Sequence, residues 1–319
     1  MPIKFDTPVL IVAWNRPEHA RRLVDSLRQF RPNRVWVSVD GPRDFSEELA
    51  VQQTRAAILE SLDWPCEIRT QFHDLNLGCR LGVASAIDWF FSQVAEGIIL
   101  EDDLVLGTDS LPFLQEMLVR YRDDPKILSI SADNSLAVTP QDGSSYFFLG
   151  FPHVWGWATW KRAWNLYEAN MDSWIDARLT DRVAAFFRSP EAQRFWTPLF
   201  DRVAFEPRFD SWAWCWAATH FANGGLSVQA SSNLVSNIGF DSAATHTRSE
   251  TTRAAAELER IFPLSHPNNV SESEELAFLT YERLASIDGA RDKENHLRKL
   301  LTSIARTRPI KFLRSYRQK

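Results

Sequence analysis

The chain has 319 residues, of which 45% are hydrophobic and 24% are charged, and this composition excludes a disordered or fibrous protein. The net charge of −5 argues against a nucleic-acid-binding surface on most of the chain. The three cysteines include no Cys-x-x-Cys pair, so we expect neither a disulfide framework nor a thiolate zinc site. No apolar run approaches the ~18 residues of a membrane span. The sequence therefore predicts a cytoplasmic globular protein with no nucleic-acid partner.

The charge is unevenly distributed along the chain. Residues 291–319 contain ten Lys or Arg residues against two acids, Asp292 and Glu294. Such a basic tail can bind anionic lipid, which would place a peripheral protein at the inner face of a membrane. It can equally be the solvated end of a helix, and the sequence leaves both interpretations open.

The first 135 residues alternate between strand-like and helix-like segments. Apolar runs predict buried strands at residues 8–14, 34–40, 66–72, 97–100 and 127–131. Apolar stripes at helical spacing predict helices at residues 17–30, 47–62, 81–94 and 113–121. Alternation of this kind is typical of right-handed βαβ units. We expect an α/β fold with a mostly parallel central sheet flanked by helices.

The pattern changes after residue 140. Residues 147–164 and 209–247 are rich in aromatics and glycine, and a charged helical stretch lies between them. From about residue 253 the chain is polar, with predicted helices at 272–286 and 293–304. The simplest division is a catalytic domain at 1–252 and a helical, basic C-terminal extension at 253–319. Within the first of these, residues 1–135 and residues 136–252 form two continuous subregions.

Polar clusters follow each of the predicted strands. They are Asn15-Arg16, Asp40-Gly41, residues 74–80 with Asn76 and Arg80, residues 101–103, and Asp133-Asn134. The carboxyl ends of parallel strands meet at one edge of a sheet, and ligands of open α/β sheets bind there. The clusters together therefore predict a nucleotide-type site.

Glu101, Asp102 and Asp103 directly follow an apolar strand. Three adjacent acids repel one another unless a cation or hydrogen-bond donors compensate. Mg²⁺ and Mn²⁺ prefer carboxylate oxygens and share their ligand shell with substrate phosphates. A helix N-terminus is the alternative, but the following residues, Leu-Val-Leu-Gly, do not begin a helix. We favour a metal site.

The other clusters are individually less specific. Asp40-Gly41 suits a base or ribose contact, and it is also an ordinary turn dipeptide. The stretch from Asn76 through Arg80 joins a strand to a helix, where glycines and a basic residue suit a diphosphate. It is neither a P-loop nor a dinucleotide-binding fingerprint.

The C-terminal half offers aromatic and acid–base candidates. Trp155, Gly156 and Trp157 belong to a tryptophan-rich segment that predicts an acceptor groove, with core packing as the alternative. Asp210 lies among aromatics, where burial would suit a general base; it could instead cap the helix that follows. His246 could bind a metal or phosphate, although a lone histidine is more often structural.

These pieces together resemble the GT-A glycosyltransferase superfamily, and within it the N-acetylglucosaminyltransferase I-like branch with its bacterial relatives. The resemblance covers roughly residues 7–250. The matching segments are residues 8–16, 37–41, 98–103 (IILEDD), 151–157 (FPHVWGW), 209–212 (FDSW) and His246. Glu-Asp-Asp after a strand is that branch's form of the DxD motif.

The resemblance implies roles for single residues. Asp103 would bind Mn²⁺ or Mg²⁺, and Asp102 would lie beside the donor sugar. Arg16 and Asp40 would hold the nucleobase of the donor, and Arg80 would hold its diphosphate. His246 would bind the metal or the phosphates. The family has Asp-Asp-Trp where this chain has Asp210-Ser-Trp, so the base is expected at Asp210, displaced by one position.

The resemblance implies an inverting transfer of a sugar from a nucleotide-diphosphate sugar, UDP-linked in the first instance, to a hydroxyl of a glycan or glycolipid acceptor. Surface polysaccharide synthesis in bacteria is the implied context. Two alternatives remain open from the sequence. One is a nucleotidyltransferase that makes a nucleotide sugar, and the other is a non-catalytic carbohydrate-binding protein.

Overall fold

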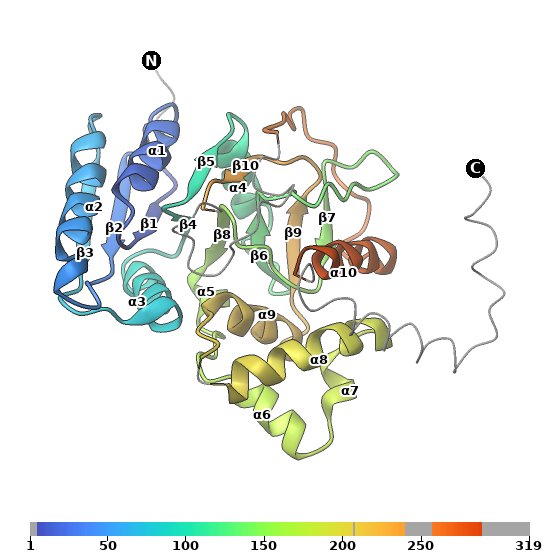
Figure 1. The fold of residues 1–319 in the computed structure, drawn as a ribbon. Coiled ribbons are helices and arrows are strands. Elements are labelled where there is room, and N and C mark those ends of the chain that lie inside the picture. Colours follow the sequence, from blue (N-terminus) through green and yellow to red (C-terminus); the bar gives the residue numbers. More distant parts are fainter. Residues whose placement is uncertain (1–4, 207, 240–256, 289–319) are drawn as a thin grey trace.

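The computed structural model describes residues 5–206, 208–239 and 257–288. His246, the predicted helix at 293–304 and the basic tail lie outside the described residues. An eight-stranded sheet forms the centre of the molecule, in the order β3-β2-β1-β4-β8-β6-β9-β7 (Figure 1). The strands are β1 (Val9–Ala13), β2 (Arg34–Val39), β3 (Glu67–Phe72), β4 (Glu96–Glu101), β6 (Ile127–Ser131), β7 (Tyr146–Leu149), β8 (Trp157–Trp160) and β9 (Leu226–Ala230). A separate antiparallel pair consists of β5 (Leu104–Leu106) and β10 (Val235–Asn237).

The predicted α/β class and the mostly parallel sheet are confirmed. β3, β2, β1 and β4 pair in parallel. β8 runs antiparallel to both of its neighbours, β4 and β6, so β6 points the same way as β4. β9 is parallel to β6, and β7 closes the sheet in the opposite direction. Only β7 and β8 therefore oppose the common direction.

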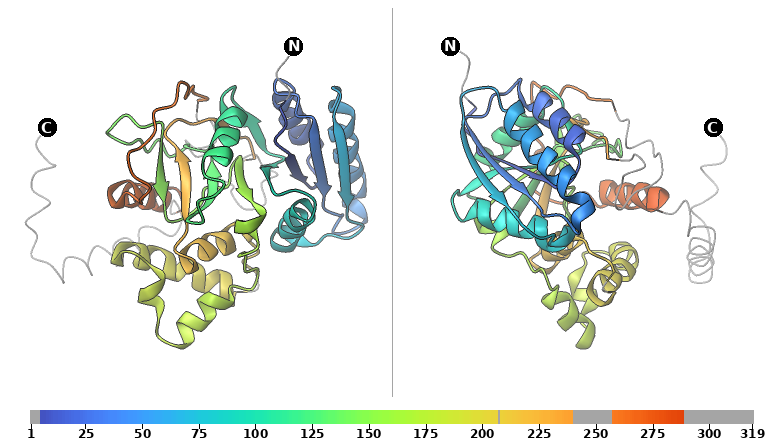
Figure 2. Two further views of the ribbon diagram at one scale, coloured as in Figure 1. Left: turned by 180° about the vertical axis from the view of Figure 1, so that it is seen from behind. Right: turned by 60° about the vertical axis from the view of Figure 1, so that its left-hand side comes forward.

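Helices cover both faces of the sheet (Figure 2). The helices are α1 (Pro17–Leu27), α2 (Glu48–Ser61), α3 (Gly78–Phe91), α4 (Ser110–Arg120), α5 (Lys161–Trp164), α6 (Asp172–Leu179), α7 (Val183–Phe186), α8 (Pro190–Phe205), α9 (Trp212–Ala222) and α10 (Glu274–Asp288), with a 3₁₀ turn η1 (Phe45–Glu47). In β1, Val9 and Ile11 pack with α1, α2 and α4, whereas Leu10 and Val12 pack with α3, α5 and α9. A strand buried on both faces explains the uninterrupted apolar run in the sequence.

A third apolar cluster includes Phe147 and Leu149 of β7, at the edge of the sheet. It joins α6, α7, α8 and α9 to one end of the sheet, below it in Figure 1. Leu276 and Tyr281 of α10 belong to the same cluster, and Ile261 packs into the main core. The described part of the predicted C-terminal extension therefore packs against the rest of the chain. No described helix is long and apolar enough to cross a membrane.

Candidate functional site

A cavity of about 440 Å³ opens where β1, β2 and β4 end, at the edge where the sequence placed the polar clusters. We call it the first cavity. It is lined by Val12, Ala13, Trp14, Arg16, Ser38, Asp40, Arg43, Asn76, Gly78, Cys79, Gly82, Val83, Glu101, Asp102, Asp103, Trp155, Asp210, Asn237 and Gly239. Six of the donor-binding and metal residues predicted from the sequence thus meet in one place, among them Arg16, Asp40 and Asn76.

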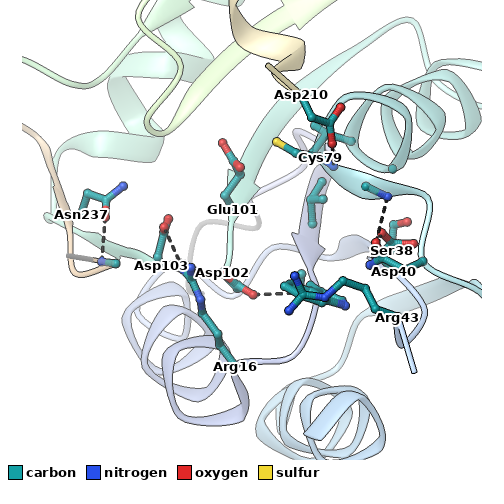
Figure 3. A pocket seen from close by; sticks show the side chains of 18 of the residues that line it. Arg16, Ser38, Asp40, Arg43, Cys79, Glu101, Asp102, Asp103, Asp210 and Asn237 are labelled. Atoms are coloured by element: carbon teal, nitrogen blue, oxygen red, sulfur yellow. Dashed lines mark hydrogen bonds and ion pairs between the residues drawn. The ribbon is translucent and has the colours of Figure 1, made fainter. Parts of the chain in front are cut away.

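The three acids stand at the junction of β4 and the β5–β10 pair. β5 starts directly after Asp103, whose backbone carbonyl accepts a hydrogen bond from Ile238 beside β10 (2.7 Å). The Nη1 atom of Arg16 lies 3.3 Å from Asp103 Oδ2 and 4.0 Å from Asp102 Oδ1. Asp102 Oδ2 accepts a hydrogen bond from the backbone amide of Trp14 (3.2 Å). In Figure 3 Glu101 lies between this group and Asp210.

The acids hold protons more tightly than free carboxyls do. Burial, together with the charges of Asp103 and Asp102, raises the pKa of Glu101 to about 8. Burial and the charge of Asp103 raise the pKa of Asp102 to about 7, against the opposing effect of Arg16. Burial also raises the pKa of Asp103. One arginine thus leaves the carboxylates under-compensated, which is the electrostatic condition that a divalent cation relieves.

The side chains that are available as ligands determine which kind of metal ion the site can bind. Within the described ranges, no group of three or more His, Cys, Asp or Glu side chains is arranged to hold a metal ion. The residues present therefore do not fit a closed structural site. Mg²⁺ is commonly held by one or two carboxylates, with water and substrate phosphates completing its shell. Asp102 and Asp103 fit an ion that is shared with a bound substrate.

The far end of the first cavity carries an indole and an arginine. The guanidinium carbon of Arg43 lies 4.4 Å from the centre of the Trp14 ring, and Trp14 Nε1 donates to the carbonyl oxygen of Gly41 (2.8 Å). Asp40 accepts hydrogen bonds from Asn76 Nδ2 (2.9 Å) and from the backbone amide of Leu77 (3.0 Å). Asp40 therefore also positions the loop before α3. A flat aromatic ring beside polar groups suits a base.

Asp210 lies against the N-terminus of α3. Its Oδ2 accepts from the amide of Cys79 (2.7 Å) and its Oδ1 from the amide of Arg80 (3.1 Å). A cap on the following helix was the structural alternative for Asp210. However, α9 begins after Ser211 without a side-chain cap, and Asp210 caps α3 instead. This long-range cap explains why α3 begins at Gly78, three residues before the predicted start.

Arg80 is not among the residues that line the first cavity. Its Nη2 donates to the carbonyl oxygens of Val203 (3.0 Å) and Phe209 (2.7 Å). The guanidinium therefore holds the loop that carries Asp210, which differs from the diphosphate contact predicted from the sequence. A basic residue at a helix start is compatible with both roles, and only the tertiary contact distinguishes them.

Cys79 lies near Glu101 and Asp210, and its thiol is poorly suited to act as a nucleophile. Burial and the negative charges of Glu101 and Asp210 raise the pKa of its thiol to about 12. A thiol in that environment stays neutral near pH 7, and the neutral form is a poor nucleophile. A covalent intermediate on Cys79 is therefore disfavoured.

A second cavity of about 510 Å³ adjoins the first. Cys79, Glu101, Trp155 and Asp210 line both cavities. The remaining lining of the second cavity is Asp133, Phe151, Pro152, His153, Val154, Trp196, Leu199, Arg202, Arg208, Phe209, Ser211, Trp212, Ala213, Trp214 and Leu284. Trp155, which the sequence predicted in an acceptor groove, thus lies at the boundary between the two spaces.

Two neighbours of Trp155 lie elsewhere. Trp157 was expected in an acceptor groove, but it is fully buried in β8 and stacks on Trp212 at 5.5 Å between ring centres. The segment is a strand that lies between β4 and β6, and all of its residues, Trp157–Trp160, are buried. Gly156 lines neither cavity: it has a φ of +60°, and a Cβ there would lie 2.7 Å from Val235 Cγ1. Glycine at this position allows the backbone to pass Val235 without a steric clash.

Besides Arg80, two further predicted donor residues lie outside the first cavity's lining, namely Asn15 and Gly41. A Cβ at Gly41 would collide with the backbone of Leu75, so the chain's own backbone makes the close approach at this glycine. Its carbonyl oxygen also accepts from Asn76 Nδ2 (3.0 Å).

Several lining residues were missed from the sequence. Trp14 and Arg43 flank predicted clusters, whereas Asn237 and His153 come from segments whose strands were not predicted. Trp14 follows an apolar run, and its position at the carboxyl end of the strand indicates a site residue. The pairing that brings Asn237 beside the acids joins it to Leu104, which lies 133 positions earlier in the chain, and no local pattern reports such a pairing.

No family model matches the chain, and no curated protein sequence matches it. Solved structures do. A mannosyltransferase from Pyrobaculum calidifontis in complex with GDP-Man and Mn²⁺ is 14% identical and covers 50% of this chain and 45% of its own, with a TM-score of 0.34. Mouse xyloside xylosyltransferase 1 is 12% identical and covers 84% and 100%, with a TM-score of 0.37. A putative glucose-1-phosphate thymidylyltransferase from Bacillus anthracis is 12% identical and covers 58% and 77%, with a TM-score of 0.28.

This chain thus spans less than half the length of the mannosyltransferase that it matches. The three TM-scores are all below 0.5, so the activity of this chain has to be argued from its own site.

Proposed function

We propose that the protein is a metal-dependent, inverting glycosyltransferase of the GT-A type. It would move a sugar from a nucleotide-diphosphate sugar to a hydroxyl of a glycan or glycolipid. The observation that carries the proposal is the meeting of two cavities at Glu101 and Asp210. One cavity combines under-compensated carboxylates with an indole, and the other is lined by aromatic rings. Transfer of a group between two substrates requires two binding sites that adjoin where the reacting atoms meet.

The first cavity would hold the donor. Trp14 and Asp40 would contact the nucleoside, and Arg16 with Asp102 and Asp103 would lie at the diphosphate end. A divalent ion bound by Asp102 and Asp103 would offset charge on the departing nucleoside diphosphate. His246 is a further candidate ligand for that ion from outside the described residues. UDP is the first nucleotide to test, in line with the resemblance of the sequence to the N-acetylglucosaminyltransferase I-like branch.

Asp210 would take the proton from the acceptor hydroxyl. A carboxylate has four lone-pair sites, and the two amides of α3 use only part of them. Held by those amides and lining both cavities, Asp210 needs no rearrangement to face a hydroxyl in the second cavity. Trp155 would separate the two substrates and limit the entry of water. The basic tail at 291–319 is proposed as a peripheral contact with anionic lipid that keeps the enzyme near a lipid-linked acceptor.

A ligand screen by thermal unfolding tests the proposal. Full-length protein is heated with UDP-, GDP- and CMP-sugars, each with Mn²⁺ and again with a chelator. At one hundred times its Kd, the correct donor stabilises the folded state by about 2.7 kcal/mol. We expect one nucleotide class to stand out, with most of its effect lost on chelation. Equal responses to all nucleotides, or none to any, would overturn the proposal.

A nucleotidyltransferase is the second candidate, because it shares a parallel α/β platform and a divalent ion. It would form product from a nucleoside triphosphate and a sugar phosphate. The aromatic second cavity favours a sugar acceptor instead. Product analysis with nucleoside triphosphates in place of nucleotide sugars separates the two candidates.

A further inference from the structure

His153 and Asp133 form a buried pair in the wall of the second cavity. His153 Nδ1 lies 3.3 Å from Asp133 Oδ2, and the two residues are 7% and 1% exposed. Asp133 follows β6, and its Oδ1 accepts from the amide of Ser135 (2.8 Å). A carboxylate only accepts hydrogen bonds, so the proton of the imidazole is on Nδ1. With the ring proton on Nδ1, Nε2 is an acceptor, and the contact with Asp133 sets the orientation of the ring.

The Nε2 atom of His153 is buried and has no hydrogen-bond partner among the described residues. Buried polar atoms normally have a partner, because an unsatisfied one costs desolvation free energy. Here the partner has to donate, since Nδ1 already uses the proton of the ring. A sugar hydroxyl is such a donor, whereas a carboxylate or phosphate group is not.

The surroundings of His153 suit a carbohydrate ring. Phe151 lies beside the imidazole, with 5.7 Å between ring centres and 33° between planes. Trp155, Trp196 and Trp214 line the same cavity. Flat aromatic faces pack against the apolar faces of sugars, and the volume of about 510 Å³ is within the range of small-molecule sites.

We propose that the second cavity binds the acceptor as a carbohydrate and that His153 accepts a hydrogen bond from one of its hydroxyl groups. That hydroxyl is not the reacting one, which lies toward Asp210 and Glu101 at the shared wall. His153 is thereby a specificity-determining residue, and Asp133 is the positioning residue that holds its ring. The inference rests on the proposed function, since it assigns the second substrate of the same site.

The first test is an NMR titration of the full-length protein labelled with ¹⁵N-histidine. Mg²⁺ and the nucleotide selected by the thermal screen are present at saturation. The probes are methyl α- and β-glycosides of common hexoses and pentoses. The His153 signal is identified by its absence in His153→Phe, which keeps a flat ring without the acceptor nitrogen. We expect at least one glycoside to shift this signal. A panel that leaves the His153 signal unmoved overturns the inference.

The second test uses monodeoxy forms of the glycoside that binds. On the wild type, removing the hydroxyl that contacts His153 raises the acceptor KM by about tenfold, because Nε2 loses its partner. For His153→Phe, the KM of the parent glycoside should be raised to the same extent as in the preceding comparison. Removing the same hydroxyl should raise the KM of this variant no further. His266→Phe, a histidine that contacts Tyr146 and lines neither cavity, is the matched control.

Donor measurements separate the two possible failures. Correct folding of His153→Phe is shown by a wild-type circular dichroism spectrum and a cooperative thermal unfolding transition. The role of His153 is refuted if that variant keeps the wild-type acceptor KM, or if every deoxy form raises the acceptor KM equally in both proteins. Either result leaves the proposed transferase function intact. If the wild type binds no nucleotide sugar at all, the proposed function fails first.

Discussion

Arg80 and Asp210 hold each other across the two halves of the chain. The backbone amide of Arg80 donates to Asp210 Oδ1 (3.1 Å), and the guanidinium of Arg80 donates to the carbonyl oxygen of Phe209, the residue before Asp210 (2.7 Å). This reciprocal contact joins the start of α3 to the loop before α9. It places a carboxylate at the wall shared by the two cavities.

The contact predicts a specific kinetic effect of Arg80→Met. Loss of the charged hydrogen bonds to Val203 in α8 and to Phe209 in the loop should displace Asp210 and lower kcat by about tenfold or more. The donor KM should change by less than about threefold, since Arg80 does not line the first cavity. Steady-state kinetics over donor concentration provides the measurement. A large rise in donor KM with unchanged kcat would show that Arg80 binds the diphosphate, as the sequence suggested.

The raised pKa of Asp102 predicts how stability depends on pH. A carboxyl group with a pKa of about 7 when folded binds more protons than its unfolded form between about pH 4 and 7. The free energy of unfolding contributed by Asp102 therefore falls as the pH rises through that window. Asp102→Asn, which resembles the protonated form, should match the wild type near pH 4 and be more stable at pH 8.

Chemical denaturation at several pH values, without divalent ions, measures this difference. The comparison between the two proteins also removes the opposing effect of His220, whose pKa burial lowers to about 3. Mn²⁺ should stabilise the wild type at pH 8 and have little effect on Asp102→Asn. A variant less stable than the wild type at pH 8 would contradict the assignment of Asp102 as an under-compensated carboxylate.

Arg43 is predicted to contribute to nucleotide binding through its stack on Trp14. Arg43→Ala should raise the Kd of the selected nucleoside diphosphate by about two- to tenfold, by removing a cation–π partner from the proposed base site. Arg69→Ala is a matched control, because Arg69 stacks on Trp36 at 5.4 Å and lines neither cavity. Isothermal titration would decide. Equal effects of the two substitutions would remove Trp14 and Arg43 from the binding site.

Gly156→Ala is predicted to destabilise the fold. The φ of +60° disfavours any side chain, and the added Cβ would lie 2.7 Å from Val235 Cγ1 in β10. Gly143→Ala provides the comparison, because Gly143 has a φ of +75° with nothing within 4 Å of an added Cβ. Both should lose about 1 kcal/mol from backbone conformation, and Gly156→Ala should lose more from the contact. Thermal melts giving equal losses would refute the steric argument.

The first half of the fold could be predicted from the sequence because its signals are local. The strand at β1 is an uninterrupted apolar run, and the strand order places the ends of β1, β2 and β4 side by side. The acids from 101 to 103, with Arg16 and Asp40, could be predicted to share a site for that reason. All of them line the first cavity.

The second half depends on contacts that no local pattern reports. Trp157 belongs to a short strand that inserts between β4 and β6, so its burial follows from pairing with distant segments. Asp210 caps a helix 130 residues before it, and Arg80 turns toward that loop. His153 could not be predicted as a site residue because its partner, Asp133, lies 20 residues away in another segment. In each case tertiary packing assigns the role.

Release of nucleoside diphosphate from the selected nucleotide sugar, with and without Mn²⁺, tests the central claim most directly. The comparison is between the wild type, Asp103→Ala and Asp123→Ala, an exposed acid outside the first cavity. We predict Mn²⁺-dependent release by the wild type and by Asp123→Ala, and a loss of about one hundredfold or more in Asp103→Ala. Release that is indifferent to Mn²⁺, or equal in all three proteins, would contradict the account.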